Sequence, residues 1–438
     1  MRTLLARAAL VAATATLPLA VAVPAASAHD SGHGGRYRTV AYFTQWGIYG
    51  RNYLPRDIGS SAGRLDVIDY AFGNVSASGS CFEANAPGQG DAWADYQRPF
   101  SAAESVDGVA DSPGQALNGN FNQLRELKAA HPGLRVQMSL GGWSWSRYFS
   151  DAALTPASRR AFVASCLDLF LRGDLPVLDG VTGGKGAAAG VFDGIDIDWE
   201  WPASAGNDGN VVRPEDRQNF PLLLAEFRRQ LDALGRERHR HYTLSAFLPA
   251  APAKVDAGVD VRRVFAPLDW ATVQGYDLHG TWETTTNHQS ALYAPPGDPS
   301  PEKFSVDLAV KTYLRAGAPR HKVLLGVPFY GHGWTGVSAG PHGDGLFQQS
   351  TGPAPSAFDP GTEDYKRLAA LPGFTVHRDR ADGVAWLYDG TTFWNFDDPV
   401  AIGEKMAYVR RHGLGGAMAW SLDGDNGALV AAMDRGLR

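Results

Sequence analysis

The 438-residue chain has few cysteines, no sustained basic run and little long apolar sequence. Its only two cysteines, Cys81 and Cys166, exclude a disulfide-rich scaffold. A net charge of −6 at pH 7 argues against a nucleic-acid surface. Beyond the first 28 residues, no segment is long and apolar enough to span a bilayer. We expect a soluble globular protein that binds neither nucleic acid nor membrane, and we expect a monomer.

The first 28 residues have the pattern of a secretory signal. A basic start with Arg2 and Arg7 precedes an apolar run over residues 8–23, and small residues at 26–28 suit a cleavage site. A membrane anchor is the alternative, but the run is short and prolines interrupt it. We therefore expect a secreted, extracellular protein whose mature chain starts near His29.

The two cysteines leave two possibilities open. Outside the cell, Cys81 and Cys166 can pair in a disulfide. Two buried thiols are the alternative, and the sequence does not decide between them.

Eight apolar segments of strand character alternate with helical patterns along the chain. The strand segments are residues 39–43, 67–72, 135–140, 194–200, 242–247, 270–276, 323–327 and 416–420. The helical patterns are residues 121–130, 156–171, 221–234, 303–316 and 399–412. This alternation predicts an α/β fold, a (β/α)8 TIM barrel. A doubly wound open sheet is the alternative, but chemically active side chains follow nearly all the strands instead of one switch point.

Local signals mark the ends of two of these helices. Thr155 precedes Pro156 and is predicted to cap the helix that starts there. Asp398 is predicted to cap the last barrel helix, and Gly413 to end it.

Two stretches are too long for ordinary barrel loops. Residues 73–120 follow the second strand and carry several aromatic side chains, so we expect them to cover the top face. Residues 335–395 separate the seventh strand from the last barrel helix. Within them, residues 374–377 and 384–388 have strand character. We predict a small α+β insertion over about 335–395, inside one domain that spans residues 29–438.

Residues 191–202 hold four carboxylic acids in an otherwise apolar segment. Asp196, Asp198 and Glu200 alternate with Ile and Trp, which is the period of a β-strand, so they project from one face about 6–7 Å apart per step. Asp193 is out of phase, and we predict a structural role for it. Crowded carboxylates on an enclosed face raise the pKa of at least one member. A glutamic acid in such a place can donate a proton near neutral pH.

A calcium-binding loop is the alternative for this segment. Such loops carry Gly and Asn between the ligands so that the chain can curl, whereas here the intervening residues are Ile and Trp. An acid/base site is therefore favoured. The histidines show no paired spacing with cysteines or acids, so we expect no metal and no cofactor.

Polar and aromatic residues gather at the carboxyl ends of the strands, where barrels of this type build their functional face. A single Tyr or Trp there is usually core, but the joint placement favours a site. The residues concerned include Trp143, Glu200, Gln274, Tyr276, Asp277, His279, His332, Trp334 and Trp420.

The acidic segment Asp193-Gly-Ile-Asp-Ile-Asp-Trp-Glu200 resembles the DxxDxDxE signature of glycoside hydrolase family 18, the chitinases. Ser139-Leu-Gly-Gly142 is similar to the SxGG motif of that family. The Tyr276-Asp277 pair and the segment 415–420 resemble its sixth- and eighth-strand motifs. Residues 388–397 are similar to the α+β insertion of bacterial members with deep grooves, and His332 stands where many relatives have Arg.

The resemblance implies a secreted chitinase that hydrolyses β-1,4 linkages between N-acetylglucosamine units of chitin and chitooligosaccharides. Glu200 would protonate the glycosidic oxygen, and the 2-acetamido group of the sugar would attack the anomeric carbon, giving an oxazolinium ion and retention. Asp198 would hold the acetamido N–H, and Asp196 would hydrogen-bond Asp198. The Tyr276 hydroxyl would orient the acetamido oxygen.

The resemblance also implies a set of substrate-binding residues and no cofactor. Trp420 would form the floor beneath the distorted sugar, and Asp277 would contact the same ring. The full set is Trp420, Asp277, Gln274, Trp143, Tyr42, Trp282 and Trp334.

Two other functions fit the same fold. One is an endo-β-N-acetylglucosaminidase acting on the chitobiose core of N-glycans, but the long insertions and rim aromatics suit a linear polymer better. The other is a non-catalytic chitin-binding lectin. Such lectins typically replace the acid glutamate, and Glu200 is intact.

Overall fold

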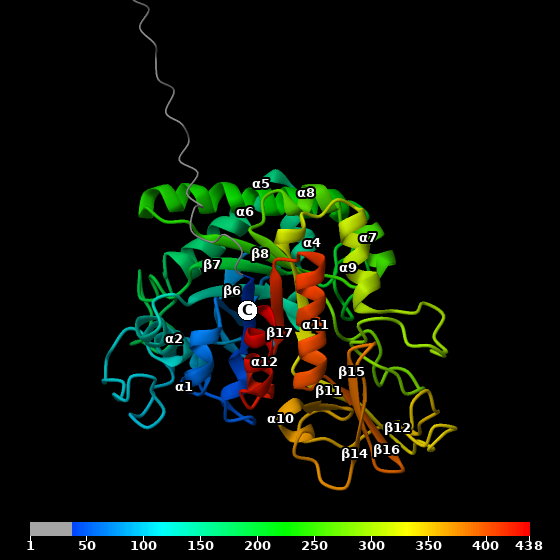
Figure 1. Cartoon of the computed structure of the whole chain (residues 1–438). Helices are drawn as coiled ribbons and strands as arrows, with labels where there is room; N and C mark the ends of the chain where they lie inside the picture. The colour runs from blue at the N-terminus through cyan, green and yellow to red at the C-terminus, as the bar shows by residue number, and fades with distance from the viewer. Residues whose placement is uncertain (1–36) are drawn as a thin grey trace, which may run out of the picture. The chain divides into compact units, whose positions relative to one another are not determined.

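The computed structural model describes residues 37–438, and within them eight parallel strands close into a barrel (Figure 1). The sheet order is β1-β17-β10-β9-β8-β7-β6-β2, and β1 also pairs with β2, which closes the ring. The predicted (β/α)8 barrel is confirmed, and the open sheet is wrong. The barrel strands are β1 (Arg38–Thr44), β2 (Val67–Val75), β6 (Arg135–Gly141), β7 (Gly194–Asp198), β8 (Thr243–Leu248), β9 (Trp270–Val273), β10 (Val323–Pro328) and β17 (Gly416–Trp420). The predicted signal at 1–28 lies outside the described residues.

Helices cover the outer side of the barrel, and α5 and α6 lie along β7 and β8 (Figure 1). The longer ones are α2 (Gly119–Ala130), α5 (Pro156–Cys166), α6 (Asp216–Arg238), α9 (Val306–Arg315), α11 (Pro399–His412) and α12 (Ala428–Leu437). The shorter ones are α1 (Pro55–Ile58), α3 (Gly142–Trp145), α4 (Phe149–Ala153), α7 (Pro252–Gly258) and α8 (Val261–Phe265).

Each predicted helix is present, with some ends displaced. Thr155 caps α5 by accepting from the Ser158 N–H, and Asp398 caps α11 by accepting from two backbone N–H groups. Gly413 ends α11 in the left-handed conformation. The start predicted at Pro221 is wrong, because α6 begins at Asp216 and Pro221 lies inside its second turn.

The alternation in β7 separates the acids from the apolar residues. Ile195, Ile197 and Trp199 pack in the large cluster between barrel and helices. Asp196 and Asp198 therefore face the barrel interior, as the period-2 pattern predicts. The alternation ends after Glu200, because Trp201 belongs to the interior cluster and not to the outer one.

A second, antiparallel sheet follows β10 (yellow to orange in Figure 1). It consists of β11 (Tyr330–Thr335), β12 (Gly352–Pro353), β13 (Thr362–Asp364), β14 (Thr375–Asp379), β15 (Val384–Tyr388) and β16 (Thr392–Phe396), with the short helix α10 (Tyr365–Leu368). The two predicted strand segments correspond to β14 and β15. The predicted start at 335 is wrong, because β11 already belongs to this sheet. The sequence of β11, Tyr-Gly-His-Gly-Trp-Thr, contains two glycines, and glycine is uncommon in strands. The sequence pattern therefore did not predict a strand at this position.

The excursion after β2 is held by buried polar groups and a disulfide. It contains three two-residue strands, β3 (Cys81–Phe82), β4 (Asn85–Ala86) and β5 (Gly90–Asp91), and a π-helical turn at Trp93–Gln97. The Asp95 carboxylate in that turn accepts hydrogen bonds from Gln45 and Tyr70, and burial raises its pKa to about 7. Cys81 and Cys166 form a disulfide that ties the excursion to α5.

Removal of this disulfide is expected to destabilise the protein. The bridge closes a loop with a sequence separation of 85 residues. Loop-closure entropy then predicts that Cys81→Ser/Cys166→Ser lowers the free energy of unfolding by about 2–5 kcal/mol. Denaturant unfolding of the double variant measures this change. Thiol titration of the unreduced, denatured wild type is the control: two reactive thiols would show that the bridge does not form.

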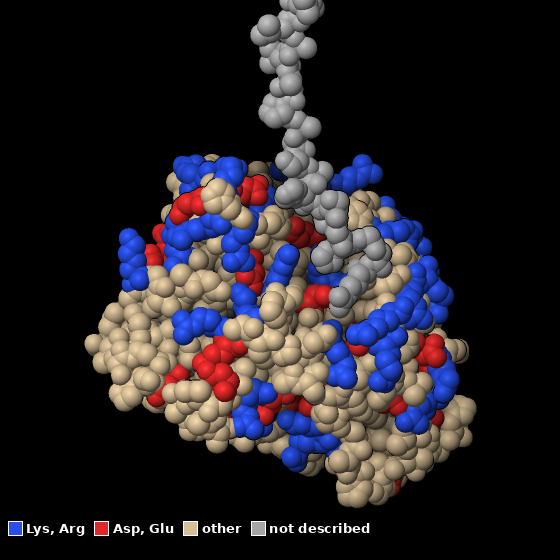
Figure 2. Space-filling view, turned by 60° about the vertical axis from the view of Figure 1, so that its left-hand side comes forward, with Lys and Arg blue, Asp and Glu red and all other residues tan. Residues whose placement is uncertain are grey.

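Surface charges are mixed in sign. Figure 2 shows Lys and Arg side chains over much of one face with acidic side chains between them. Helix α6 alone pairs Arg228 with Asp232 and Arg229 with Glu226. Such exposed pairs contribute at most about 1 kcal/mol each. In the described residues, no helix combines the length and apolar character needed to cross a membrane.

Candidate active site

Hydroxyl groups from three other barrel strands enclose Asp196, two of them beside β7 and one across the barrel. Its Oδ2 accepts from Ser139 Oγ at 2.7 Å and from Tyr42 Oη at 2.8 Å, and its Oδ1 accepts from Ser245 Oγ at 2.6 Å. Burial raises the pKa of Asp196, and these hydrogen bonds oppose the rise. The donors lie on β6, β1 and β8, so the barrel itself fixes this carboxyl group.

Asp198 lies one step further along β7, at the wall of a cavity. Burial raises its pKa well above the usual range, and the charges of Glu200, Asp196 and Asp69 add to the rise. Among the described residues, its buried Oδ1 has no hydrogen-bond partner. Among the described residues, the hydrogen bond implied between Asp196 and Asp198 is not formed, and the Asp196 oxygens accept from Tyr42, Ser139 and Ser245 instead.

Glu200 ends the acidic segment, and its side chain lines two cavities. Burial and the Asp277 carboxylate raise its pKa to about 8, and the Lys254 ammonium opposes them. Its backbone is fixed, because its N–H donates to Ser146 Oγ at 3.1 Å and its carbonyl accepts from Asn210 at 2.9 Å. A carboxyl group with this pKa is mostly protonated at neutral pH and can act as a general acid.

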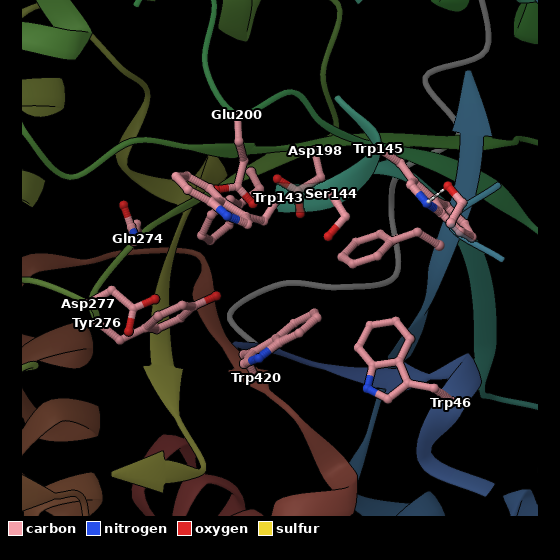
Figure 3. Close-up of a pocket in the computed structure, with 14 residues that line it drawn as sticks. Trp46, Trp143, Ser144, Trp145, Asp198, Glu200, Gln274, Tyr276, Asp277 and Trp420 are labelled. Carbon is pink, nitrogen blue, oxygen red and sulfur yellow. Dashed lines mark hydrogen bonds between the residues drawn. The ribbon is translucent and has the colours of Figure 1, made fainter. Parts of the chain in front are cut away.

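The first cavity, of about 490 Å³, lies over the barrel mouth. Figure 3 shows Glu200, Asp198 and Trp143 on one side of it and Tyr276, Asp277 and Trp420 on the other. The Trp420 ring stacks on Phe72 with centroids 5.6 Å apart, which fixes it as a flat apolar wall. Burial and the nearby Asp198 charge raise the pKa of Tyr276, so its hydroxyl stays protonated and able to donate.

Two glycines after β6 let the chain pass close to this cavity. Gly141 and Gly142 have φ of 107° and 70°, in the left-handed range that disfavours side chains. A Cβ on Gly142 would lie 2.5 Å from the Phe72 ring. The SxGG spacing therefore reflects close packing of the backbone beside the aromatic wall.

A second cavity, of about 810 Å³, adjoins the first and shares Trp143, Glu200, Gln274 and Asp277 with it. Its walls come from the barrel loops and from the second sheet. The residues that only this cavity uses include Trp201, Lys254, Trp282, Glu283, His332, Asp359 and Thr362. Glu200 therefore lies where the two cavities meet. A group that donates a proton to a bond spanning both cavities must lie at this position.

Two of the predicted substrate-binding residues do not reach either cavity. Trp334 is fully buried in the core of the second sheet, and its Nε1 donates to the Glu283 carbonyl. Tyr42 is 2% exposed, and its hydroxyl is committed to Asp196. These two contacts, which the resemblance implied, do not fit the structure, because Trp334 packs inside the second sheet and Tyr42 packs in the barrel interior against Asp196.

The other predicted residues come together around the two cavities. Trp143 and Trp282 are 50% and 62% exposed. Gln274, Tyr276, Asp277 and Trp420 line the first cavity with Asp198 and Glu200. Asp193 lies at the far end of β7, where it accepts from the Val136 N–H and pairs with Lys128 and Arg240, which fits its predicted structural role.

Several residues in or beside the cavities were not predicted from the sequence. Trp46 and Phe72 line the first cavity, and Lys254 lines the second. Asp69 on β2 is a further buried acid, and the charge of Asp196 adds to the burial that raises its pKa. An acid in the apolar run Val-Ile-Asp-Tyr-Ala-Phe was a visible signal for Asp69. No feature of the neighbouring sequence marks Lys254, because its ammonium group acts on Glu200 only in the folded chain.

Comparison with curated proteins and solved structures places the chain among known enzymes. Residues 38–425 match the family model described as glycosyl hydrolases family 18. Chitinase A1 from Niallia circulans is 34% identical, and the match covers 89% of this chain and 56% of that protein. Chitinase 63 from Streptomyces plicatus is 38% identical, with 91% and 60% covered. The chain therefore spans between 56% and 60% of the length of these two relatives.

The solved catalytic domain of psychrophilic chitinase B from Arthrobacter TAD20 is 48% identical, with a TM-score of 0.89. That match covers 92% of this chain and 96% of the solved one. The family model spans both the acidic strand and the last barrel strand. The chain belongs to family 18 of the glycosyl hydrolases.

Proposed function

We propose that this chain is a chitinase that hydrolyses β-1,4 linkages between N-acetylglucosamine units of chitin and chitooligosaccharides. The observation that carries the proposal is Glu200, a carboxyl group with a pKa of about 8 at the junction of two cavities. A linear polymer can occupy both cavities at once, with one linkage beside Glu200. The names of the related proteins support the same activity.

In the proposed mechanism the first cavity holds the sugar whose bond is cleaved. Trp420 forms the floor beneath this sugar, and Glu200 protonates the glycosidic oxygen. The acetamido carbonyl oxygen attacks the anomeric carbon, the bond to the leaving sugar breaks, and an oxazolinium ion forms. Water then adds to the anomeric carbon with net retention and returns a proton to Glu200.

Asp198 and Tyr276 are proposed to hold the attacking acetamido group. The unpartnered Asp198 Oδ1 suits the acetamido N–H, and the protonated Tyr276 hydroxyl suits the acetamido oxygen. Asp196 adds negative charge behind Asp198. This charge would favour the positive oxazolinium over the neutral substrate.

We also propose that the protein is secreted and acts as a monomer. The pattern of the first 28 residues and the Cys81–Cys166 disulfide both suit an oxidising compartment. The acids and the residues that line both cavities all come from one chain.

Product analysis tests this function. Incubation with chitohexaose is expected to give shorter chitooligosaccharides whose new reducing ends are first in the β configuration, as proton NMR at early times would show. A high-mannose glycopeptide should stay intact. Initial α-anomers would contradict the retaining mechanism, and faster cleavage of the glycopeptide would favour an endo-β-N-acetylglucosaminidase. Binding of chitohexaose without new reducing ends would indicate a lectin.

Lys254→Met is expected to move the alkaline limb of the pH profile. The Lys254 ammonium lowers the pKa of Glu200, and Glu200 must be protonated to act. Loss of this charge raises that pKa, so the fall of kcat/KM near pH 8 moves to higher pH, by less than about one unit. Lys185→Met, at an exposed loop position, is the control with an unchanged profile. A limb that moves to lower pH would contradict the assignment of Glu200 as the acid.

A further inference from the structure

The amino ends of the barrel strands form the face of the barrel opposite the two cavities. The barrel strands all run parallel, so their first residues and the last turns of the helices between them meet on this face. Glu200 and both cavities lie beyond the carboxyl end of β7. A molecule bound at the amino ends therefore leaves the cavities open.

A basic patch lies on this face, where β9, β10 and β17 begin. It consists of six exposed residues, Arg262, Arg315, Arg320, His321, Arg410 and Arg411. The Arg320 guanidinium donates to the His412 carbonyl oxygen at 3.0 Å, which joins the turn before β10 to the end of α11. Arg262 lies beside the turn after α9, since a Cβ on Gly317 would lie 2.7 Å from the Arg262 Nε. The patch therefore combines residues from three separate segments of the chain.

The positive charge of the patch is not neutralised by neighbouring acids. Asp269, just before β9, already pairs with Arg228 at 3.4 Å and with His241 at 2.8 Å. Asp307 at the start of α9 pairs with Lys311 at 2.7 Å. Among the described residues, the five arginines of the patch form no salt bridge. The whole chain has a net charge of −6, so the patch is not part of a general excess of basic residues.

Helix dipoles explain only part of this charge. Arg315 lies in the last turn of α9, and Arg410 and Arg411 lie in the last turn of α11, where cations stabilise the helix. Arg320 lies in a short 3-10 turn before β10, and Arg262 lies near the start of α8. The dipoles of α9 and α11 do not account for these two residues.

We propose that the basic patch is a docking surface for an acidic glycan, a linear polysaccharide with carboxylate or sulfate groups along its length. Guanidinium groups bind such anions through paired, charge-assisted hydrogen bonds. Chitin carries no negative charge, so the patch is not a further contact for the proposed substrate, and the inference goes beyond the proposed function. A glycan bound here holds the protein by the face opposite the cavities and leaves Glu200 accessible.

Other polyanions fit the patch less well. Single-stranded nucleic acids bind through aromatic side chains on which the bases stack, and membrane surfaces take up exposed apolar side chains. In the part of the chain that the structure describes, the large exposed apolar side chains lie at other positions, such as Trp93, Trp143 and Trp282. The patch offers positive charge and N–H donors, which suit the anionic groups of a hydrated polysaccharide.

Binding measurements test this surface with two probes. Heparin carries sulfate and carboxylate groups, and polygalacturonate carries carboxylates alone. The variant Arg315→Gln/Arg320→Gln/Arg410→Gln/Arg411→Gln is expected to bind heparin about thirtyfold or more weakly than the wild type at low salt. The slope of log Kd against log salt concentration should become less steep by roughly one for each lost contact. Binding of polygalacturonate that depends on the same arginines would show that carboxylates suffice, whereas dependence for heparin alone would assign the patch to sulfated glycans.

A control variant separates the patch from the net charge. Arg56→Gln/Arg217→Gln/Arg367→Gln/Arg380→Gln removes four exposed arginines outside the patch and changes the net charge equally. It should bind heparin as the wild type does. Equal weakening by both variants, or a wild type that binds neither glycan, would overturn the inference. Duplex DNA that binds through the patch at least as tightly as heparin would overturn the assignment to a glycan.

Chitohexaose hydrolysis separates the patch from the cavities. The patch variant should keep the wild-type kcat, and saturating heparin should leave wild-type hydrolysis unchanged. Heparin that competes with chitohexaose would place the glycan in the cavities and defeat the inference. Because glycan binding is measured without turnover, a protein that binds heparin through the patch and cleaves no chitin would refute the proposed function alone.

Thermal melts establish that the variants are folded. If the fourfold patch variant unfolds, the four single substitutions replace it. Each is expected to weaken heparin binding by about two- to threefold. Single variants that all bind as the wild type does would overturn the inference.

Discussion

Glu200→Gln is expected to lose most of its turnover while keeping its fold and its affinity for chitin. The glutamine amide has the shape of the acid but cannot transfer a proton to the glycosidic oxygen. Loss of a general acid typically costs about 10²–10⁴-fold in rate. The backbone contacts of residue 200 to Ser146 and Asn210 do not involve the side chain and remain. The measurement is kcat on chitohexaose, with the dissociation constant and melting temperature determined in parallel.

The control for this variant is Glu237→Gln, which removes a surface carboxylate that pairs with Arg172 far from both cavities. It should keep wild-type turnover. Near-normal hydrolysis by Glu200→Gln would show that another group supplies the proton. A large loss of chitohexaose binding would instead indicate that the substitution disturbs the site as a whole.

Cello-oligosaccharides are expected to resist cleavage altogether. Cellohexaose has the same β-1,4 backbone as chitohexaose but carries a hydroxyl where chitin has the acetamido group. Without that group the proposed nucleophile is absent, and an intramolecular attack of this kind can contribute effective molarities of about 10⁵–10⁸ M. Release of reducing ends from cellohexaose should therefore stay below detection at enzyme concentrations that consume chitohexaose within minutes.

Competition binding separates lack of chemistry from lack of contact. Trp143, Trp282 and Trp420 offer flat apolar surfaces that can stack on either sugar. Cellohexaose at high concentration should thus inhibit chitohexaose hydrolysis weakly. Appreciable cellohexaose cleavage would mean that an enzyme carboxylate attacks the anomeric carbon, and Asp198 would be the first candidate.

The sequence predicted the parts of the fold that depend on local periodicity. Asp196, Asp198 and Glu200 alternate with Ile and Trp, so their common face could be read from the chain alone. The caps at Thr155 and Asp398 are equally local, because each side chain bonds to N–H groups two or three residues away. Such features need no knowledge of distant partners.

Other features depend on contacts between segments far apart in the chain. Trp334 is buried because β16 and neighbouring loops cover it, and nothing near position 334 shows that. Asp196 bonds to Tyr42, Ser139 and Ser245 instead of Asp198, since barrel closure brings four strands together at that depth. The disulfide was undecided for the same reason: its two cysteines meet only in the folded chain.

The barrel and the second sheet contribute different residues to the proposed site. The acids, Tyr276 and Trp420 all belong to the barrel strands or their ends, whereas His332, Asp359 and Thr362 in the second cavity belong to one continuous insertion. Under the proposed function, the groups that cleave the bond would all belong to the barrel, and the insertion would add part of the wall of the second cavity. Exchange of residues 330–396 between relatives offers a route to new acceptor-side preference that leaves the proton donor untouched.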